Sequence, residues 1–428
     1  MLLYRLLHSL EGETMKFHTA LRPWAIRRLE KIEQVDLIVG IPCFNNDSTI
    51  EHVIDMASEG IAQHYQDLKA VIIISDGGST DDTRELSRDK TVYPFIEKMV
   101  TIYRGLPGKG SALRMIFEAA NSLNARACVL CDADLRSIKP EWIKALADPI
   151  LEHGYDFVAP VYSRYKYDAT ITNNIAYNLT RALFGKRVRQ PIGGDFGLSQ
   201  AMIDHYFYCG QDIWVTDIAK FGIDIWMTIS AIVSGKSICQ AYLGTKVHDV
   251  KDPLENLGPM FRQVVHPLFQ LMESHAQLWK SIKDSTPVPV YGEPLTQEPE
   301  PFSVDLPGMV DNYKEGFNNL SVLWEQIINP ESFAVLKSLA RNRKKDHFHM
   351  PTEDWVKIVY DFASTFHRWK RDRGKLVEIM RPLYYARVAS FINETKDMNN
   401  AQAEEIIERQ AQTFEGLKPY LIKMWDKE

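Results

Sequence analysis

The sequence lacks an excess of basic residues. Its 50 Lys and Arg residues are outnumbered by 56 Asp and Glu residues, which gives a formal net charge of −6. Proteins that bind nucleic acid as their main partner usually carry a strongly basic surface. The charge balance therefore argues against nucleic acid, while an anionic small ligand needs only a local basic pocket.

The chain is also poor in cysteine. An odd number of thiols does not suit a disulfide framework, and most of these thiols lie in apolar runs. The cysteines are Cys43, Cys128, Cys131, Cys209 and Cys239. The one C-x-x-C has no second pair to complete a zinc site, so we expect buried free thiols in a reducing compartment.

The sequence has no long hydrophobic run. A helix that crosses a membrane needs about 20 apolar residues, and no run approaches this length. The opening residues, MLLYRLLHSLEGE, are interrupted by Arg5 and His8, and acidic residues follow in place of a small-residue cleavage site. We therefore expect no membrane span, a cytoplasmic location and an N-terminal helical segment over residues 1–34.

What the sequence does have is strand–helix alternation from about residue 35 to residue 161. The buried strands are expected at 35–44, 70–75 and 127–131. We expect Pro42 to stop the first strand and Gly60 to end the helix after it. This alternation predicts an α/β domain over residues 35–250, with a mostly parallel sheet covered by helices on both faces.

The composition changes beyond residue 250. Residues 284–310 are rich in proline and poor in periodic apolar residues, which is typical of a linker or a long surface loop. The remainder has helical spacing of aromatic and aliphatic residues, as in TEDWVKIVYDFASTFHRW. We expect residues 251–428 to form a mainly helical region whose apolar stripes pack in the core or form a homodimer contact.

Polar clusters follow the predicted strands directly. The clusters are NND at 45–47, DGGSTDD at 76–82 and DAD at 132–134. In sheets of this type ligands bind outside the carboxyl ends of the strands. Three polar clusters at one edge of one sheet therefore predict a binding crevice.

The pair Asp132 and Asp134 ends an apolar strand. Alternation in an extended segment points both carboxylates to the same side, and two close carboxylates repel each other unless a cation lies between them. Few protein oxygens completed by substrate phosphates are the usual ligands of Mg²⁺, and Mn²⁺ suits the same set. The DXD motif therefore indicates a site for a metal diphosphate, although solvated strand ends also carry such pairs.

A second motif places Lys109 between Gly108 and Gly110, just before a predicted helix. Glycines allow a close backbone approach, and a helix N-terminus attracts anions. The motif is not a Walker sequence, because the first spaced glycine and the hydroxyl after the lysine are missing. We interpret Lys109 as a phosphate contact, the alternative being a flexible loop with a solvated lysine.

In this order and spacing, the blocks IPCFNNDSTI, ISDGGSTDDT, GKGSAL and LCDADL resemble the sugar-nucleotide half of A-type (GT-A) glycosyltransferases. Three later blocks, QPIGGDFGLS, FGIDIWMT and GTKVHD, are similar to the retaining enzymes that make glucosylglycerate, mannosylglycerate and glucosyl-3-phosphoglycerate. The resemblance covers about residues 35–270. It implies a Rossmann-like GT-A fold, a nucleoside diphosphate sugar as donor (UDP-glucose or a GDP-sugar) and a small acid such as glycerate as acceptor.

The resemblance also implies a role for each matching position. Donor contacts fall on Pro42, Asn45, Asp76, Lys109, Asp132, Gly193 and Gly194. The metal ligands fall on Asp132, Asp134 and His248, and acceptor contacts on Arg164, Thr172, Asp195 and Asp224. Catalysis is assigned to Asp134, Lys109 and Asp224. For three of these a plain structural role is the alternative: Asp76 as the start of an Asx turn, His248 as a structural histidine and Arg164 as a surface charge.

One position departs from the pattern. Enzymes of this group that use 3-phosphoglycerate carry an arginine two residues before the threonine, where it can fork onto the phosphate, and here Thr170 stands in its place. Lys166 or Arg189 could supply the missing charge. The hypothesis is that unphosphorylated glycerate is the acceptor, with glucosyl-3-phosphoglycerate synthesis as the alternative.

The implied reaction retains the anomeric configuration. No side chain is clearly placed as a nucleophile in the family, so a front-face route is preferred over a double displacement through Asp224 or Asp195. Two other functions stay open: an inverting transferase of polysaccharide or lipid-linked sugar, and a nucleotidyltransferase or non-catalytic binder of sugar nucleotides.

Overall fold

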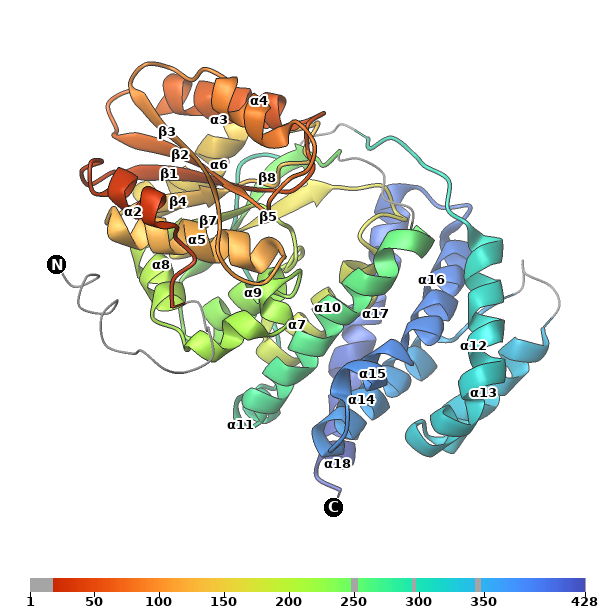
Figure 1. The fold of residues 1–428 in the computed structure, drawn as a ribbon. Coiled ribbons are helices and arrows are strands. Elements are labelled where there is room, and N and C mark those ends of the chain that lie inside the picture. Colours follow the sequence, from red (N-terminus) through yellow and green to blue (C-terminus); the bar gives the residue numbers. More distant parts are fainter. Residues whose placement is uncertain (1–17, 248–252, 295–297, 343–347, 428) are drawn as a thin grey trace.

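The computed structural model describes residues 18–247, 253–294, 298–342 and 348–427, with the side chains of 253–257 left aside (Figure 1). Within these residues the centre is an eight-stranded sheet of order β10-β8-β5-β7-β4-β1-β2-β3. Its strands are β1 (Leu37–Cys43), β2 (Ala70–Asp76), β3 (Ile96–Ile102), β4 (Ala127–Leu130), β5 (Phe157–Ser163), β7 (Phe196–Ser199), β8 (Ile238–Thr245) and β10 (Val290–Tyr291). A short second pair joins β6 (Lys186–Arg187) to β9 (Thr286–Pro287). All the pairs of the large sheet are parallel except those of β7 with β4 and β5.

Both faces of the sheet are covered, which explains the continuous apolar runs of its strands. Side chains of β1 alternate between the faces: Leu37 and Val39 join one buried cluster and Ile38 the other. The helices α3 (Ile50–His64) and α6 (Pro140–Leu151) pack against each other and supply the first cluster. The second face carries α5 (Lys109–Ser122), α8 (Gln200–Phe207) and α9 (Ile223–Val233). The helices α2 (Pro23–Leu29) and α4 (Thr83–Asp89) lie at the β3 end of the sheet.

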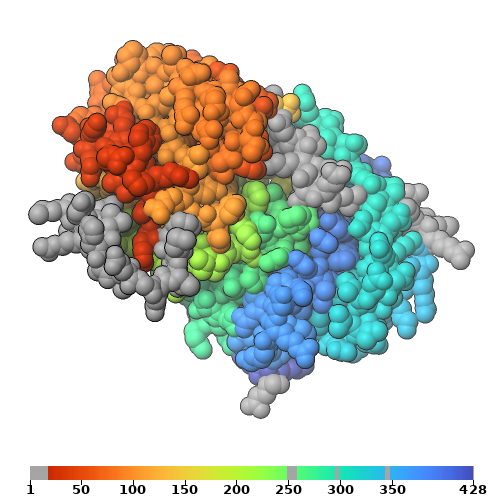
Figure 2. Space-filling view, viewed as in Figure 1, coloured from red at the N-terminus to blue at the C-terminus, as the bar shows by residue number. Residues whose placement is uncertain are grey.

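The C-terminal part is helical, and its core is continuous with that of the second face. Its helices are α10 (Pro253–Ser274), α11 (Ala276–Ser281), α12 (Leu306–Ile327), α13 (Pro330–Arg341), α14 (Thr352–Arg368), α15 (Arg373–Glu378), α16 (Arg381–Thr395), α17 (Asn400–Gly416) and α18 (Lys418–Trp425). They join the sheet domain through α17 on α7 (Tyr177–Phe184) and α10 on α9, and Figure 2 shows them side by side with it. The predicted fold, α/β with a mainly helical C-terminal region, is confirmed.

Some expectations about the elements were wrong. Pro42 lies within β1, because β4 pairs with β1 only as far as Gly40 and a proline at 42 removes no ladder hydrogen bond on that side. Gly60 lies inside α3, where a Cβ atom would be 2.5 Å from the Pro140 carbonyl oxygen of α6, so the glycine permits the helices to cross. The edge strand β3 was not predicted, since Glu97 and Lys98 interrupt its apolar residues.

The proline-rich segment at 284–310 is more than a linker. Part of it forms β10, which extends the large sheet beside β8, and Pro299–Phe302 lines the main cavity. The domain limits at residues 34 and 250 stay predictions, as does the homodimer contact. Of the predicted N-terminal helical segment over residues 1–34, residues 1–17 lie outside the described ones, and the rest contains the helix α2. Of the helices described, none combines the length and the apolar character that a bilayer crossing requires.

Candidate active site

The main cavity, with a volume of about 930 Å³, opens at the carboxyl edge of the sheet. Residues that directly follow strands line it: Phe44 after β1, Gly77 after β2, Arg164 after β5 and Lys246 after β8. The DXD loop after β4 contributes Asp132 and Asp134. The crevice predicted from the strand ends is therefore present. Helix α10 and the segment Pro299–Phe302 close its far side.

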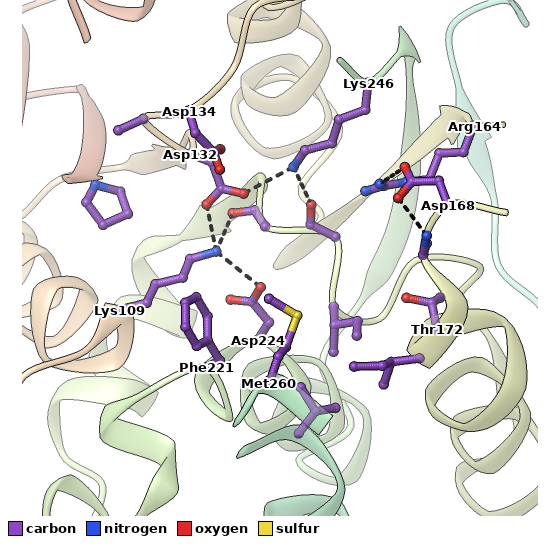
Figure 3. Close-up of a pocket in the computed structure, with 18 of the residues that line it drawn as sticks. Lys109, Asp132, Asp134, Arg164, Asp168, Thr172, Phe221, Asp224, Lys246 and Met260 are labelled. Atoms are coloured by element: carbon purple, nitrogen blue, oxygen red, sulfur yellow. Dashed lines mark hydrogen bonds and ion pairs between the residues drawn. The ribbon is translucent and has the colours of Figure 1, made fainter. Parts of the chain in front are cut away.

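A buried network of charges forms the floor of this cavity (Figure 3). The Lys109 Nζ lies 2.7 Å from Asp132 Oδ1 and 3.1 Å from Asp224 Oδ2. The Lys246 Nζ lies 3.1 Å from Asp132 Oδ2 and 2.8 Å from Asp195 Oδ2. Asp132 thus has an ammonium on each of its oxygens, whereas Asp224 has one ammonium and a second oxygen, Oδ1, that is buried without a partner among the described residues.

This asymmetry shifts the pKa values of the two carboxyl groups in opposite directions. Burial alone would raise the pKa of Asp132, but the charges of Lys109 and Lys246 outweigh it and hold that pKa well below its usual range. For Asp224, burial raises the pKa and the single ammonium of Lys109 offsets only part of the effect. Burial opposes the charge of Lys109, yet Asp132 and Asp224 raise its pKa above the usual value. Lys109 and Asp132 are therefore charged, and Asp224 accepts a proton more readily.

Sequence reasoning missed Lys246. Besides its two carboxylates, its ammonium donates to the Gly193 carbonyl at 2.9 Å and lies 5.0 Å from the centre of the Tyr162 ring. The signal that could have revealed it is its place directly after β8, at the same edge as the polar clusters. Lys246 is the second cation that holds Asp132.

The paired glycines let their loop lie against Asp132. Gly194 has φ +92°, and a Cβ atom there would be 2.0 Å from Asp132 Oδ2. At Gly193 a Cβ atom would be 2.3 Å from Pro160 Cγ. Asp195 comes next and is fully buried: its carboxylate accepts from the Asp132 N–H at 2.8 Å and from the Tyr162 hydroxyl.

Asp195 is not among the residues that line the cavity. It lies behind Asp132, where both of its oxygens accept hydrogen bonds from the backbone and side chains that hold the DXD loop. Its predicted contact with the acceptor stays a prediction.

The predicted donor contacts Pro42, Asn45 and Asp76 do not all face the cavity. Pro42 lines the cavity, together with Phe44, whereas Asp76 does not. The Asp76 carboxylate is fully buried and accepts hydrogen bonds from the N–H groups of residues 78 and 79 and from a hydroxyl in the turn. Asn45 (φ +55°) likewise accepts from the N–H of Thr80 at 2.9 Å. This is the turn role that was the alternative for Asp76.

The glycines beside Lys109 are required for a reason other than the predicted one. A Cβ atom at Gly110 would be 1.9 Å from the Ile218 carbonyl oxygen, and one at Gly108 would be 2.6 Å from that of Ala219. The Gly110 N–H donates to the Lys220 carbonyl at 3.0 Å. The G-K-G motif therefore lets the loop before α9 pack on the N-terminus of α5, and Lys109 points into the cavity.

Of the predicted metal ligands, Asp132 and Asp134 lie side by side at the cavity (Figure 3), and His248 lies outside the described residues. No group of three potential ligands for a metal ion occurs within the part of the chain that is described. The strand that leads to His248 is nevertheless fixed to the DXD loop: the Val247 N–H donates to Ser137 Oγ at 2.8 Å, and the Arg136 N–H donates to the Val247 carbonyl at 2.9 Å. Two carboxylates at this place suit a hard divalent cation.

The predicted acceptor contacts Arg164 and Thr172 lie across the cavity from Lys109 (Figure 3). Arg164 donates to Asp168 at 2.6 Å and lies 5.0 Å from the centre of the Tyr162 ring, while its Nε is buried without a partner among the described residues. Asp224 borders the same space from the N-terminus of α9. Arg164 is therefore a pocket residue and not a surface charge.

Comparisons with known proteins give one family and several solved structures. Residues 38–208 match the family model described as Glycosyl transferase family 2. Glucosyl-3-phosphoglycerate synthase from Mycobacterium tuberculosis, solved with phosphoglyceric acid, is 24% identical, with 59% of this chain and 86% of that chain covered and a TM-score of 0.44. Its complex with Mg²⁺ and uridine diphosphate gives 26% identity, 59% and 84% coverage and the same TM-score. Such TM-scores carry no inference about substrates, and no curated protein matches the sequence.

Proposed function

We propose that this glycosyltransferase moves a hexose from a nucleoside diphosphate sugar, UDP-glucose or a GDP-sugar, to the hydroxyl group of a small hydroxy acid such as glycerate. The observation that carries the proposal is the buried ammonium of Lys109, which lies between Asp132 and Asp224 at the carboxyl edge of the sheet. A charge in this position is preorganised for a diphosphate leaving group.

The donor end would hold a divalent metal ion. Asp132 and Asp134 supply oxygen ligands of the kind that Mg²⁺ and Mn²⁺ prefer, and the predicted ligand His248 follows a strand end already fixed to the DXD loop. When bound, the ion supplies Lewis-acid stabilisation of the departing diphosphate. Lys246 and Asp195 hold Asp132 in place for this role.

We favour retention by a front-face route. The bond from the anomeric carbon to the diphosphate breaks, the bond to the acceptor oxygen forms on the same face, and the acceptor proton passes to the departing phosphate oxygen. Of the two carboxylates that could serve as a nucleophile, Asp195 lies behind Asp132 and does not line the cavity, and Asp224 has one of its oxygens paired with Lys109. Their contacts support the route without a covalent intermediate.

The acceptor carboxylate is assigned to Arg164, and neither Lys166 nor Arg189, the two candidates for the charge missing at Thr170, lines the cavity. The Lys166 ammonium donates to the carbonyl groups of residues 395 and 398 at the end of α16, at 2.7 and 2.6 Å. Arg189 pairs with Glu404. These contacts favour an unphosphorylated acceptor over 3-phosphoglycerate.

The test is a donor and acceptor screen with Mn²⁺ or Mg²⁺, followed by NMR of the product. We expect nucleoside diphosphate release to depend on a hydroxy acid and the product to keep the donor's anomeric configuration. A higher kcat/KM for 3-phosphoglycerate than for glycerate would instead identify glucosyl-3-phosphoglycerate synthesis. Release of pyrophosphate from a nucleoside triphosphate would indicate a nucleotidyltransferase, and an inverted product or transfer only to polysaccharide or lipid-linked sugar would contradict the proposed reaction.

A further inference from the structure

Besides the charged network, a group of apolar and aromatic side chains lines the main cavity, and we name this group the acceptor wing. Its members are Tyr165, Tyr167, Ile171, Ile192, Met260 and Phe302. Three of these residues, Tyr165, Tyr167 and Ile171, lie in the chain between Arg164 and Thr172, which Figure 3 shows across the cavity from Lys109. The residues of the wing come from four parts of the chain: the segment after β5, the loop before β7, helix α10 and the proline-rich segment.

The walls of the wing are held in place by contacts among their aromatic rings. The Tyr165 ring lies edge to face with Tyr167 and with Phe302, each at a centroid distance of 5.2 Å. Tyr165 and Phe302 are only half-buried in the described structure. Apolar surface that borders a cavity in this way gains stability when an apolar ligand group covers it.

The polar groups of the wing are largely used by the protein itself. The Tyr167 hydroxyl donates to the Ile392 carbonyl at 3.3 Å, and the Thr170 hydroxyl pairs with that of Tyr384. Asp168 accepts from Arg164 and from the Ala169 N–H. A ligand in the wing therefore meets ring faces and aliphatic side chains, with the buried Nε of Arg164 as a donor that has no partner in the described structure.

The charges and the volume of the cavity restrict the class of ligand further. Lys166 and Arg189 are paired and do not line the cavity. Arg164 pairs with Asp168 but keeps its Nε without a partner among the described residues, so it can still donate to one carboxylate. A second anionic group buried there without a cation of its own would carry a large cost. The cavity volume of about 930 Å³ is near the upper end of the range for sites that bind one drug-sized ligand.

We propose that the preferred acceptor is a monoanionic hydroxy acid that carries an aromatic or branched apolar substituent, which the acceptor wing binds while Arg164 binds its carboxylate. This inference rests on the proposed function and specifies its acceptor class. Phe302, on the proline-rich segment, is the specificity-determining residue that it names.

The experiment measures kcat/KM for glycerate, lactate, 3-phenyllactate and 3-phosphoglycerate with the full chain, Mn²⁺ and the active donor. We expect 3-phenyllactate to exceed glycerate by at least about tenfold, the size of effect that apolar pockets give. Phe302→Ala should lower kcat/KM for 3-phenyllactate by about tenfold and leave glycerate almost unchanged. The matched control is Phe95→Ala, an exposed aromatic residue outside the cavity, which should change neither value.

The outcomes separate the two proposals. Transfer to glycerate at a higher kcat/KM than to 3-phenyllactate, or an equal loss for both acids in Phe302→Ala, overturns the wing proposal and leaves the proposed function standing. Transfer to none of the four acids, while the donor is still used on another acceptor class, contradicts the acceptor class in both. A thermal shift by 3-phenyllactate that persists in Phe302→Ala also counts against the wing.

Discussion

Asp76 and Asp132 make an informative comparison, because both lie at the carboxyl ends of strands on the same edge of the sheet, Asp76 as the last residue of β2 and Asp132 two residues after β4. Asp132 faces the cavity with an ammonium on each oxygen. Asp76 turns back into its own loop and is fully buried. Two carboxylates at equivalent strand ends thus differ: that of Asp132 lies at the cavity, and that of Asp76 stabilises its own turn.

The difference lies in the donors that each loop offers. Gly78 (φ +84°) and Ser79 bring two N–H groups and a hydroxyl to the Asp76 carboxylate. At Asp132 the backbone N–H is taken by Asp195, and the carboxylate projects towards lysines from other elements. The position of a carboxylate at a strand end therefore predicts that it lies at the ligand-binding edge of the sheet. The hydrogen-bond donors in its own loop decide whether its oxygens face the cavity or the loop.

The largest effect is expected at the second DXD carboxylate. Asp134→Ala should abolish turnover and metal dependence, with a loss of about a thousandfold or more, because the Lewis acid would lose a ligand. The measurement is kcat/KM over a Mn²⁺ titration, with circular dichroism to show an intact fold. Asp67→Ala, an exposed carboxylate in the turn before β2, is the control. Near-normal kcat in Asp134→Ala would remove the metal assignment.

Lys109→Met should lower kcat by about a hundredfold to a thousandfold, the usual result of removing one preorganised group that stabilises a leaving charge. It also leaves Asp224 without its ammonium. Because Lys109 is proposed to stabilise charge that develops in the transition state, donor binding should weaken less than turnover falls. Separate determination of kcat and the donor Kd tests this. If Lys109→Arg and Lys109→Met are equally active, the ammonium has no role in the reaction.

The sequence predicted the edge of the sheet and most of the residues at it, because strand periodicity and the DXD and G-K-G motifs are local signals. It could not predict Lys246, whose partners lie 51 and 114 residues away in the chain. Nor could it show that Asp195 supports Asp132 from behind, or that Gly110 is needed for contact with Ile218. These facts depend on long-range packing, which leaves no local pattern.

The same limit applies to the far side of the cavity. The proline content of residues 284–310 predicted a loop correctly in character, but its covering of the cavity depends on α10 and on contacts such as that between Phe302 and Tyr165. Edge strand β3 was missed because charged residues on an edge strand hide its period. Local composition predicts whether a segment is a loop, a helix or a strand, whereas tertiary contacts determine where in the fold it lies.

Asp76→Asn tests whether the Asp76 carboxylate stabilises its turn or contacts the nucleoside. The amide keeps one acceptor oxygen and loses the other, so we expect the free energy of unfolding to fall by about 1–3 kcal/mol. If the turn role is the main one, kcat/KM at saturating metal should fall by less than about tenfold, a change below 1.4 kcal/mol. Urea unfolding and steady-state kinetics give the two values. A large loss of donor affinity with unchanged stability would instead support the predicted contact with the nucleoside.

Asp217 provides the smallest test, as a third carboxylate used for structure. His266 Nδ1 lies 3.1 Å from Asp217 Oδ2, and this contact, together with Lys220 and Arg262, lowers the pKa of Asp217 from 3.8 to about 2. Because the folded-state pKa is the lower one, the contribution of this group to stability is present above about pH 4 and is lost as the pH falls to about 2. Asp217→Asn removes that part of the pH dependence. The free energy of unfolding of the wild type should therefore fall by about 1–2 kcal/mol more than that of the variant over this window, and parallel pH profiles would show that the pair with His266 contributes nothing.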